Sequence, residues 1–485
     1  DVTFAWQLSL LPCSGVTTAG RVPEASATSQ PGTPVFDAPW PLRGTPAFEA
    51  TPPAWRERFA ERFLRDLTRN VIDPWYPVCV DRQAGGFLCD FDSRWRPRGA
   101  QRRMLEFQAR QTRTAARFGQ AFPERVEFRE IALHGLRYLR EVMHDGVDGG
   151  WFWMVDRNGR PLAGGTKHAH GTAYVVDAGV EVYRLTGAAE GLDMACEAFG
   201  WLEQILHDDA RGGYHGWATR DGRPILRPAD VPSVDGADMG EPLGHGVGLK
   251  DANVHSDMLE AWTLLLDEWP QASVRARLAE TYELVTTRFG TPAGSMHYLA
   301  YPALTPVPGS ERYGYSLQTS FRLLAAADGI GIPRAVATQQ ACAFVEHAIE
   351  WAWDDPRGGF IEAGPAAEPS VLTGVALTVR KRPWWVQTEG AKALLLMSLL
   401  NPEATHYRRM FERLVGVIDR EFIDHRHGGW HSLARGDWGL RRRLRRLAPP
   451  KGDIWKDASH EADMYLAAAR MLLGLHPKEP MRPIA

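Results

Sequence analysis

Two segments place polar side chains on helical faces that are otherwise apolar, where burial costs free energy unless the groups are paired or used. Gln108 and Arg110 lie in the first, and an inward-facing arginine is a fork for sugar hydroxyls or a carboxylate. In the second, Asn253, Asp257 and Glu260 follow the spacing i, i+4, i+7. One face of a helix therefore presents an amide and two carboxylates, which predicts a ligand site.

A tandem of tryptophans, Trp384 and Trp385, comes directly before an apolar helical run. Indole rings stack on the C–H faces of sugars, and the nearby Gln387 or Glu389 could bond the hydroxyls. The simpler alternative is that both rings pack in the core. We retain the ligand-binding interpretation because polar residues accompany the rings.

His460 begins an amphipathic segment, five residues after Trp455. An imidazole titrates near neutral pH, so that His460 is a candidate general acid or base. A lone histidine is more often structural, and the sequence leaves both possibilities open.

The elements that must position these side chains are predicted by an internal repeat. Aspartate, three residues, two glycines and an aromatic residue occur together five times, in Asp81–Phe87, Asp145–Trp151, Asp208–Tyr214, Asp354–Phe360 and Asp424–Trp430. The gap between the third and fourth copies is two periods long, and a degenerate copy near Gly294 and Tyr298 fills it. Six units of similar length therefore extend from about residue 53 to about residue 478.

Each unit has room for two helices and a hairpin. Apolar residues recur at helical spacing in residues 124–143, 171–185 and 258–266, and the Gly-Gly-aromatic motif indicates a turn that enters a short strand. Because the count is six and neither end has a polar capping repeat, we predict an all-α (α/α)6 barrel with these hairpins on one face, rather than an open solenoid.

Composition limits the possible partners. A net charge of −3 gives no electrostatic reason to expect nucleic acid or anionic lipid, and no apolar run is long enough to span a membrane. The five cysteines, Cys13, Cys79, Cys89, Cys196 and Cys342, lack the spacing of a disulfide framework or a zinc site. We expect a cytoplasmic monomer or homodimer that needs no cofactor and no metal.

The first fifty residues are rich in Pro, Ser, Thr and Ala and show little periodicity. We predict that residues 1–50 are an arm or leader and that residues 51–485 form the barrel domain. A remnant of an export signal is the alternative interpretation of the arm.

From about residue 55 to residue 478 the chain resembles the N-acylglucosamine 2-epimerase superfamily, which includes cellobiose 2-epimerases, mannose isomerases and sulfoquinovose isomerases. The resemblance rests on the hairpins and on a series of motifs in the same order: Gln108–Arg110, Lys167–Ala173 with its His170, Asn253–Glu260, Trp384–Glu389 and Trp455–His460. It implies an (α/α)6 barrel and metal-independent proton transfer beside the carbonyl of a ring-opened mono- or disaccharide.

The resemblance also implies roles for individual residues. Arg110 matches the arginine that holds the sugar, His460 matches the C-terminal catalytic histidine, and Trp455 matches its stacking neighbour. Other positions depart from the pattern. Asp257 stands where the family usually has a histidine, and Tyr315 and Gln318 replace the second catalytic histidine and its supporting glutamate.

Three functional hypotheses remain open at this point. The first is a sugar epimerase or isomerase in which His460 moves the proton, Asp257, His170 or Tyr315 takes part, and Arg110 holds the carbonyl oxygen. The second is a glycoside hydrolase or lyase that uses carboxylates among Asp257, Glu260 and Glu389. The third is a barrel that binds sugar without turnover. Besides Arg110 and His170, the predicted contacts to the sugar are Gln108, Asn253, Glu260, Gln318, Trp384, Trp385, Gln387, Glu389 and Trp455.

Overall fold

The computed structural model describes residues 46–231, 247–366, 378–440, 448–476 and 478–481. The chain divides into two compact units, Asp1–Phe36 and Asp37–Ala485, and the first lies outside the described residues. Most of the predicted arm, together with Cys13, is therefore not described. A short helix, α1 (Pro46–Glu49), opens the described part. No helix in these ranges is long and apolar enough to cross a membrane.

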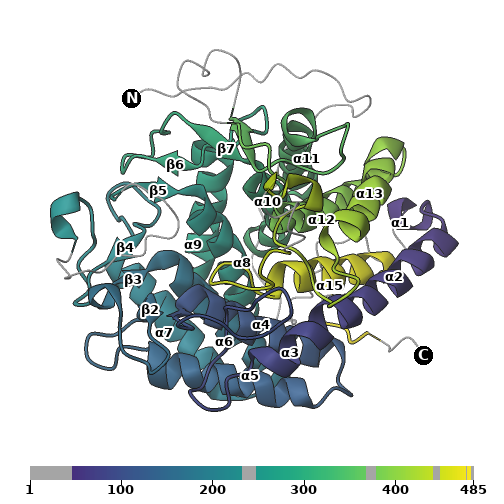
Figure 1. Cartoon of the computed structure of the whole chain (residues 1–485). Helices are drawn as coiled ribbons and strands as arrows, with labels where there is room; N and C mark the ends of the chain where they lie inside the picture. Colours follow the sequence, from purple (N-terminus) through teal and green to yellow (C-terminus); the bar gives the residue numbers. More distant parts are fainter. Residues whose placement is uncertain (1–45, 232–246, 367–377, 441–447, 477, 482–485) are drawn as a thin grey trace, which may run out of the picture. The chain divides into compact units, whose positions relative to one another are not determined.

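Twelve long helices in the described part of the second unit form an inner and an outer ring (Figure 1). The inner helices are α4 (Leu105–Ala121), α6 (Ala169–Thr186), α8 (Ala252–Glu268), α10 (Tyr313–Ile330), α12 (Trp384–Leu400) and α15 (Ser459–Leu473). The outer helices are α2 (Pro53–Leu67), α5 (Glu127–Tyr138), α7 (Ala189–Ile205), α9 (Ala272–Leu284), α11 (Arg334–Ala352) and α13 (Thr405–Val417). A short helix, α3 (Asp73–Cys79), follows α2, and π-helical turns extend four of the outer elements, at Thr68–Ile72, Leu139–Met143, Val285–Phe289 and Ile418–Phe422.

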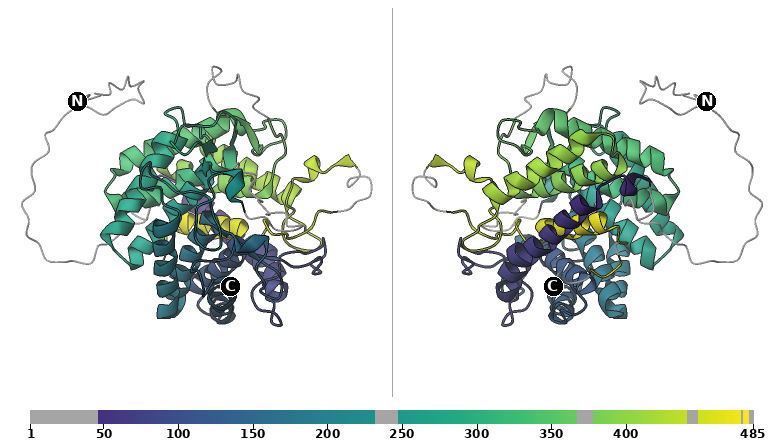
Figure 2. Two further views of the ribbon diagram at one scale, coloured as in Figure 1. Left: turned by 90° about the vertical axis from the view of Figure 1, so that its left-hand side faces the viewer. Right: turned by 90° about the vertical axis from the view of Figure 1, so that its right-hand side faces the viewer.

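The ring closes between its first and last helices. Each inner helix packs against its two inner neighbours and most extensively against one outer helix, and the yellow α15 completes the ring by contacting both α4 and the purple α2 (Figures 1 and 2). The (α/α)6 barrel predicted from the repeat count is confirmed.

Short antiparallel pairings join each inner helix to the following unit. Four are two-stranded sheets, β1 (Arg103–Met104) with β2 (Met154–Val155), β3 (Lys167–His168) with β4 (Trp217–Ala218), β5 (Lys250–Asp251) with β6 (Leu299–Ala300) and β7 (Ser310–Arg312) with β8 (Ala363–Pro365). The bridges Pro383–Leu433 and Phe91–Gly452 occupy the corresponding places before α12 and α15. All six pairings therefore lie at the N-terminal ends of the inner helices.

The Gly-Gly turns need glycine for a conformational reason. In all five copies of the motif both glycines have positive φ, from 63° to 88°, a region that side chains with a Cβ rarely adopt. A bridge such as Val80–Phe87 then closes each hairpin. The sixth hairpin is closed by Gly290–Met296, so that Met296, and not Tyr298, occupies the aromatic position.

Buried side chains fasten these hairpins to the inner helices. Four of the five motif aspartates bind a basic residue located before an inner helix, as in the pair of Asp81 with Arg103 at 2.6 Å, whereas Asp354 binds Arg357 of its own hairpin. The Gln108 amide both accepts from the backbone N–H of Phe87 and donates to its carbonyl, at 2.7 and 2.9 Å. Gln387 bonds Phe360 in the same way, and His255 accepts from the N–H of Tyr214. The same position on α4, α8 and α12, occupied by Gln108, His255 and Gln387, thus holds a hairpin in place.

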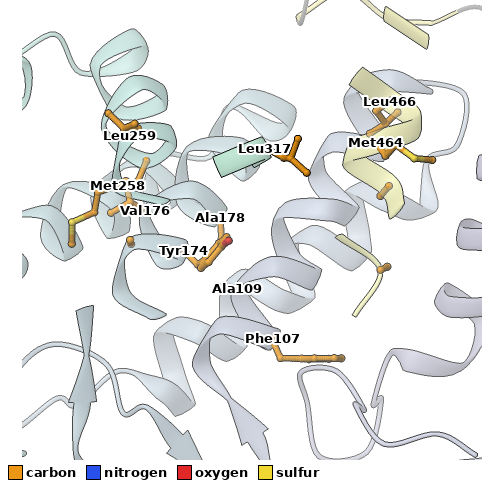
Figure 3. Packing of buried hydrophobic residues seen from close by; sticks show 14 of the residues in the cluster. Phe107, Ala109, Tyr174, Val176, Ala178, Met258, Leu259, Leu317, Met464 and Leu466 are labelled. Carbon is orange, nitrogen blue, oxygen red and sulfur yellow. The ribbon is translucent and has the colours of Figure 1, made fainter. Parts of the chain in front are cut away.

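Buried apolar side chains form a continuous core in the barrel. Figure 3 shows part of it, where Phe107 of α4, Tyr174 of α6, Met258 of α8 and Leu466 of α15 lie among other buried side chains. Several tryptophans, including Trp75, Trp151, Trp153, Trp262 and Trp430, are almost fully buried here. Much of the high tryptophan content therefore serves packing.

Candidate active site

The barrel axis is lined by polar side chains at regular helical intervals. Asn253, Asp257 and Glu260 of α8 are at i, i+4 and i+7, as the sequence indicated. The same spacing, continued to i+11, occurs on two more inner helices, in Glu106, Arg110, Arg113 and Arg117 of α4 and in His170, Tyr174, Asp177 and Glu181 of α6. Sequence reasoning missed both series, although the spacing itself was a sufficient signal.

Contacts among these side chains connect all six inner helices. Successive pairs are Arg110 with Ser459, Glu106 with His170, His170 with Asp257, Asp257 with Arg322, Tyr315 with Trp385 and Glu389 with His460. We call this set the axial circuit. It brings together Arg110, His170, Asn253, Asp257, Tyr315, Trp384, Trp385, Glu389 and His460 from the sequence-predicted site.

His170 lies between two carboxylates. Its Nε2 is 3.4 Å from Glu106 Oε1 and 3.2 Å from Asp257 Oδ2, and its Nδ1 is 3.1 Å from the Asn253 amide. Burial alone lowers the pKa of this imidazole, but the charges of Glu106 and Asp257 outweigh burial and raise the pKa to about 9. His170 is therefore a cation at neutral pH.

Protonation of His170 should stabilise the fold below neutral pH. Because the folded pKa of about 9 exceeds the ordinary value near 6.5, this contribution is complete below about pH 6.5 and is lost as the pH rises through about 9. The shift corresponds to on the order of 3 kcal/mol. Denaturant unfolding of the wild type and of His170→Gln should therefore differ more at pH 6 than at pH 10. A difference that is independent of pH would show that His170 is neutral in the folded state.

The guanidinium group of Arg110 is bound through Nη1 and Nε, whereas its Nη2 has no partner among the described residues. Its Nη1 donates to Glu106 at 2.6 Å, and its Nε contacts Ser459 Oγ at 2.8 Å and Asp457 Oδ2 at 2.9 Å. Its Nη2 is buried and has no hydrogen-bond partner in the described part of the chain, and the second oxygen of Glu106 has none there either. A rigidly held guanidinium with an unused N–H group can bind an oxygen atom of a ligand.

His460 stands at the N-terminus of α15 with a defined orientation. Its Nδ1 lies 2.9 Å from Glu389 Oε1, whereas no described residue bonds its Nε2. A carboxylate that accepts from Nδ1–H leaves the Nε2 lone pair available as a base. The indoles of Trp384 and Trp385 lie 6.4 and 6.0 Å from the imidazole, measured between ring centroids.

An aromatic row continues from His460 to α10. Trp385 contacts Tyr315 at 5.1 Å between ring centroids, and Tyr315 stacks on Tyr298 at 5.4 Å with the ring planes 7° apart. Burial raises the pKa of the Tyr315 phenol well above its usual value, so that Tyr315 is neutral at physiological pH. Its neighbour Gln318 is buried and cannot titrate. No base comparable to His460 therefore stands on α10.

Glu260 lies one helical turn deeper than the axial circuit. It forms ion pairs with Arg113 at 3.3 Å, Arg117 at 2.8 Å and Arg322 at 3.0 Å. These arginines hold the pKa of Glu260 well below its usual range, despite burial. Glu260 was predicted to contact a sugar, but in the structure it belongs to a layer of ion pairs.

Three other predicted sugar contacts have different surroundings. The amides of Gln108 and Gln387 are used by the hairpin backbones of Phe87 and Phe360. Trp455 is half-buried and makes no ring contact with His460 in the described residues, where Trp384 and Trp385 take that place. Spacing in the sequence could not show which helical positions face the barrel axis and which face a hairpin.

Comparison with known proteins places this barrel in a family. A sequence model of the N-acylglucosamine 2-epimerase family matches residues 85–227 and 323–454, which together are more than half of the chain. The chain belongs to this family. The resemblance noted from the motifs is thereby confirmed.

Relatives of this family member match over nearly their whole length. Cellobiose 2-epimerase of Bacteroides fragilis is 25% identical over 423 residues, which are 84% of this chain and 98% of that protein. The structure of cellobiose 2-epimerase from Bacillus thermoamylovorans superposes with a TM-score of 0.73 at 19% identity, covering 85% of this chain and 99% of that one. A D-mannose isomerase superposes with a TM-score of 0.67 at 18% identity, covering 88% and 99%.

Proposed function

We propose that this family member is a sugar isomerase that interconverts a reducing aldose and its ketose through a single proton-transfer base, His460. Epimerase or isomerase activity is what the family supports. The observation that favours isomerisation is that His460 offers a free Nε2, while the position of the family's second histidine holds a neutral tyrosine, Tyr315.

A single base is sufficient for aldose–ketose exchange. His460 removes the proton from C2 of the open-chain aldose, and the electron pair forms a C1–C2 double bond as O1 gains negative charge. His460 then returns the proton to C1 on the same face, while the O2 hydroxyl proton passes to O1 as the ketone forms. Epimerisation instead requires protonation of C2 from the opposite face. In this site Asp257 is ion-paired with His170 and Arg322 and accepts a hydrogen bond from the Tyr174 hydroxyl, so we do not assign it as that second base.

The sugar would be held by groups that have unused bonding capacity. The free Nη2 of Arg110 would stabilise the developing charge on O1, and the second oxygen of Glu106 would accept from a hydroxyl. Trp385 and Tyr315 supply flat apolar surfaces for the C–H faces of the sugar. The cationic His170 keeps Glu106 ionised, since Glu106 has a pKa lowered to about 2 by His170 and Arg110 in spite of burial.

Hydrolysis by a pair of carboxylates is not favoured. It requires one carboxyl group that is protonated near neutral pH. Burial raises the pKa of Glu389, but Lys392 and His460 outweigh it, and the pKa of Glu260 is lowered as well. Both acids are therefore ionised and ion-paired, and neither fits the role of general acid.

The test is an NMR screen of D-mannose, D-glucose, D-fructose and cellobiose with the protein in D2O. We expect one aldose–ketose pair to interconvert, with deuterium entering C2 of the aldose and C1 of the ketose. Formation of a C2 epimer without any ketose would contradict the single-base proposal.

A further inference from the structure

Lys392 is a buried cation beside the axial circuit, and the mechanism above assigns it no role. It lies on α12 with 7% of its surface exposed, and its Nζ is 2.8 Å from Glu389 Oε2 and 5.4 Å from the centroid of the Phe321 ring. Burying an ammonium group is costly unless it is paired. The ion pair with Glu389 offsets this cost, and we ask what the buried pair does for the neighbouring His460.

Glu389 is shared between Lys392 and His460. Its Oε1 faces His460 Nδ1 at 2.9 Å while its Oε2 faces Lys392, and the carboxylate is 1% exposed. Since Glu389 and Lys392 are three residues apart, one turn of α12 fixes their spacing. The three side chains form a linear set that ends at the free Nε2 of His460.

A carboxylate beside an imidazole favours the imidazolium form, and a nearby cation opposes that effect. We propose that Lys392 is a positioning residue that limits the basicity of His460 by drawing on the carboxylate that both share. This inference rests on the proposed function, because it assigns His460 the role of base. Lys392 and His460 bind opposite oxygens of one carboxylate, so the cation reduces the attraction of Glu389 for the imidazole proton.

Other charged groups near this set are already paired. From α15, Asp463 lies near Lys392 but binds Arg113 and Arg117. From α10, Arg322 lies near Glu389 but binds Asp257 and Glu260. Lys456, which precedes α15, binds Glu461. Among the described residues, Lys392 is thus the cation in direct contact with Glu389.

The experiment compares Lys392→Gln with the wild type in two measurements. The first follows the imidazole signal of His460 through a pH titration without sugar, the signal being assigned by its loss in His460→Asn. The second records kcat/KM against pH. Removing the cation leaves the Glu389 charge uncompensated, so the titration midpoint of His460 and the acidic limb of kcat/KM should both move up by about 0.5 to 1 pH unit. Lys392→Arg should restore both.

Controls separate this effect from a general loss of charge or fold. Lys381→Gln, at an exposed position, removes one cation and should shift neither curve. If Lys392→Gln proves too unstable, Glu389→Gln supplies the opposite test, because loss of the carboxylate should move the midpoint down. An unchanged midpoint in Lys392→Gln, or failure of Lys392→Arg to restore it, would overturn the inference. A shifted midpoint with an unshifted kcat/KM limb would leave the inference intact and overturn the role of His460 as base.

Discussion

Replacing His460 by Asn should abolish interconversion of the sugar and incorporation of solvent deuterium. A positioned general base contributes about 10²- to 10⁴-fold, and no other described group of the axial circuit has a free basic nitrogen, so we expect a loss of at least about 10³-fold in kcat. Glu389→Gln keeps the imidazole but removes its carboxylate partner, and should lose about 10- to 100-fold. The measurement is the NMR rate in D2O on the sugar identified by the screen.

The control for this experiment is a histidine on the surface. His425, whose side chain is 51% exposed, can be changed to Asn without touching the axis, and this variant should retain wild-type rates. Thermal unfolding should confirm that His460→Asn remains folded. Residual activity within tenfold of the wild type in a folded His460→Asn protein would contradict the assignment of His460 as base.

Arg110→Lys should give the second largest loss. Lysine keeps the positive charge between Glu106 and Asp457 but cannot reproduce the planar fork whose free Nη2 we assign to O1. Removing a donor to a developing oxyanion typically costs about 10²- to 10³-fold in kcat. We expect a loss in that range, with a much smaller change in KM, measured by steady-state kinetics.

Stability must be followed in the same variant. Arg110→Met would remove the arginine from two buried carboxylates, Glu106 and Asp457, and breaking a buried ion pair typically costs about 3 to 5 kcal/mol, so lysine is the more informative replacement. The exposed Arg137 on α5 offers a matched control, since Arg137→Lys should change neither rate nor stability. A change confined to KM would indicate that Arg110 binds the sugar but does not stabilise the transition state.

The architecture was predictable because its signals are local. Paired glycines with positive φ mark five of the six hairpins in the sequence, and their spacing indicates the number of helix pairs. The sixth unit was harder, since Met296 and Ser295 replace the aromatic residue and the second glycine, and only the neighbouring Gly294 remains. Its aromatic position was accordingly misplaced at Tyr298.

Contacts between side chains of different inner helices were less predictable. The i, i+4, i+7 spacing placed Asp257 on the correct face of α8, but no local signal shows that Arg322, from a different helix, binds it. Glutamines illustrate the same limit. Gln108 lies two residues before Arg110, yet its side chain is turned to Phe87, because consecutive helical positions face in different directions.

The role of His460 as a single base that isomerises a sugar is tested most directly by following deuterium in the first turnovers in D2O. The account predicts that the ketose forms from the aldose and carries less deuterium at C1 than complete exchange would give. One imidazole removes the proton from C2 and, in a fraction of the turnovers, returns the same proton to C1 before it exchanges with solvent. It also predicts that the His460→Asn variant neither forms ketose nor incorporates deuterium into the sugar. A C2 epimer that carries one deuterium per turnover, with no ketose formed, would instead require a second base on the opposite face and would contradict the account.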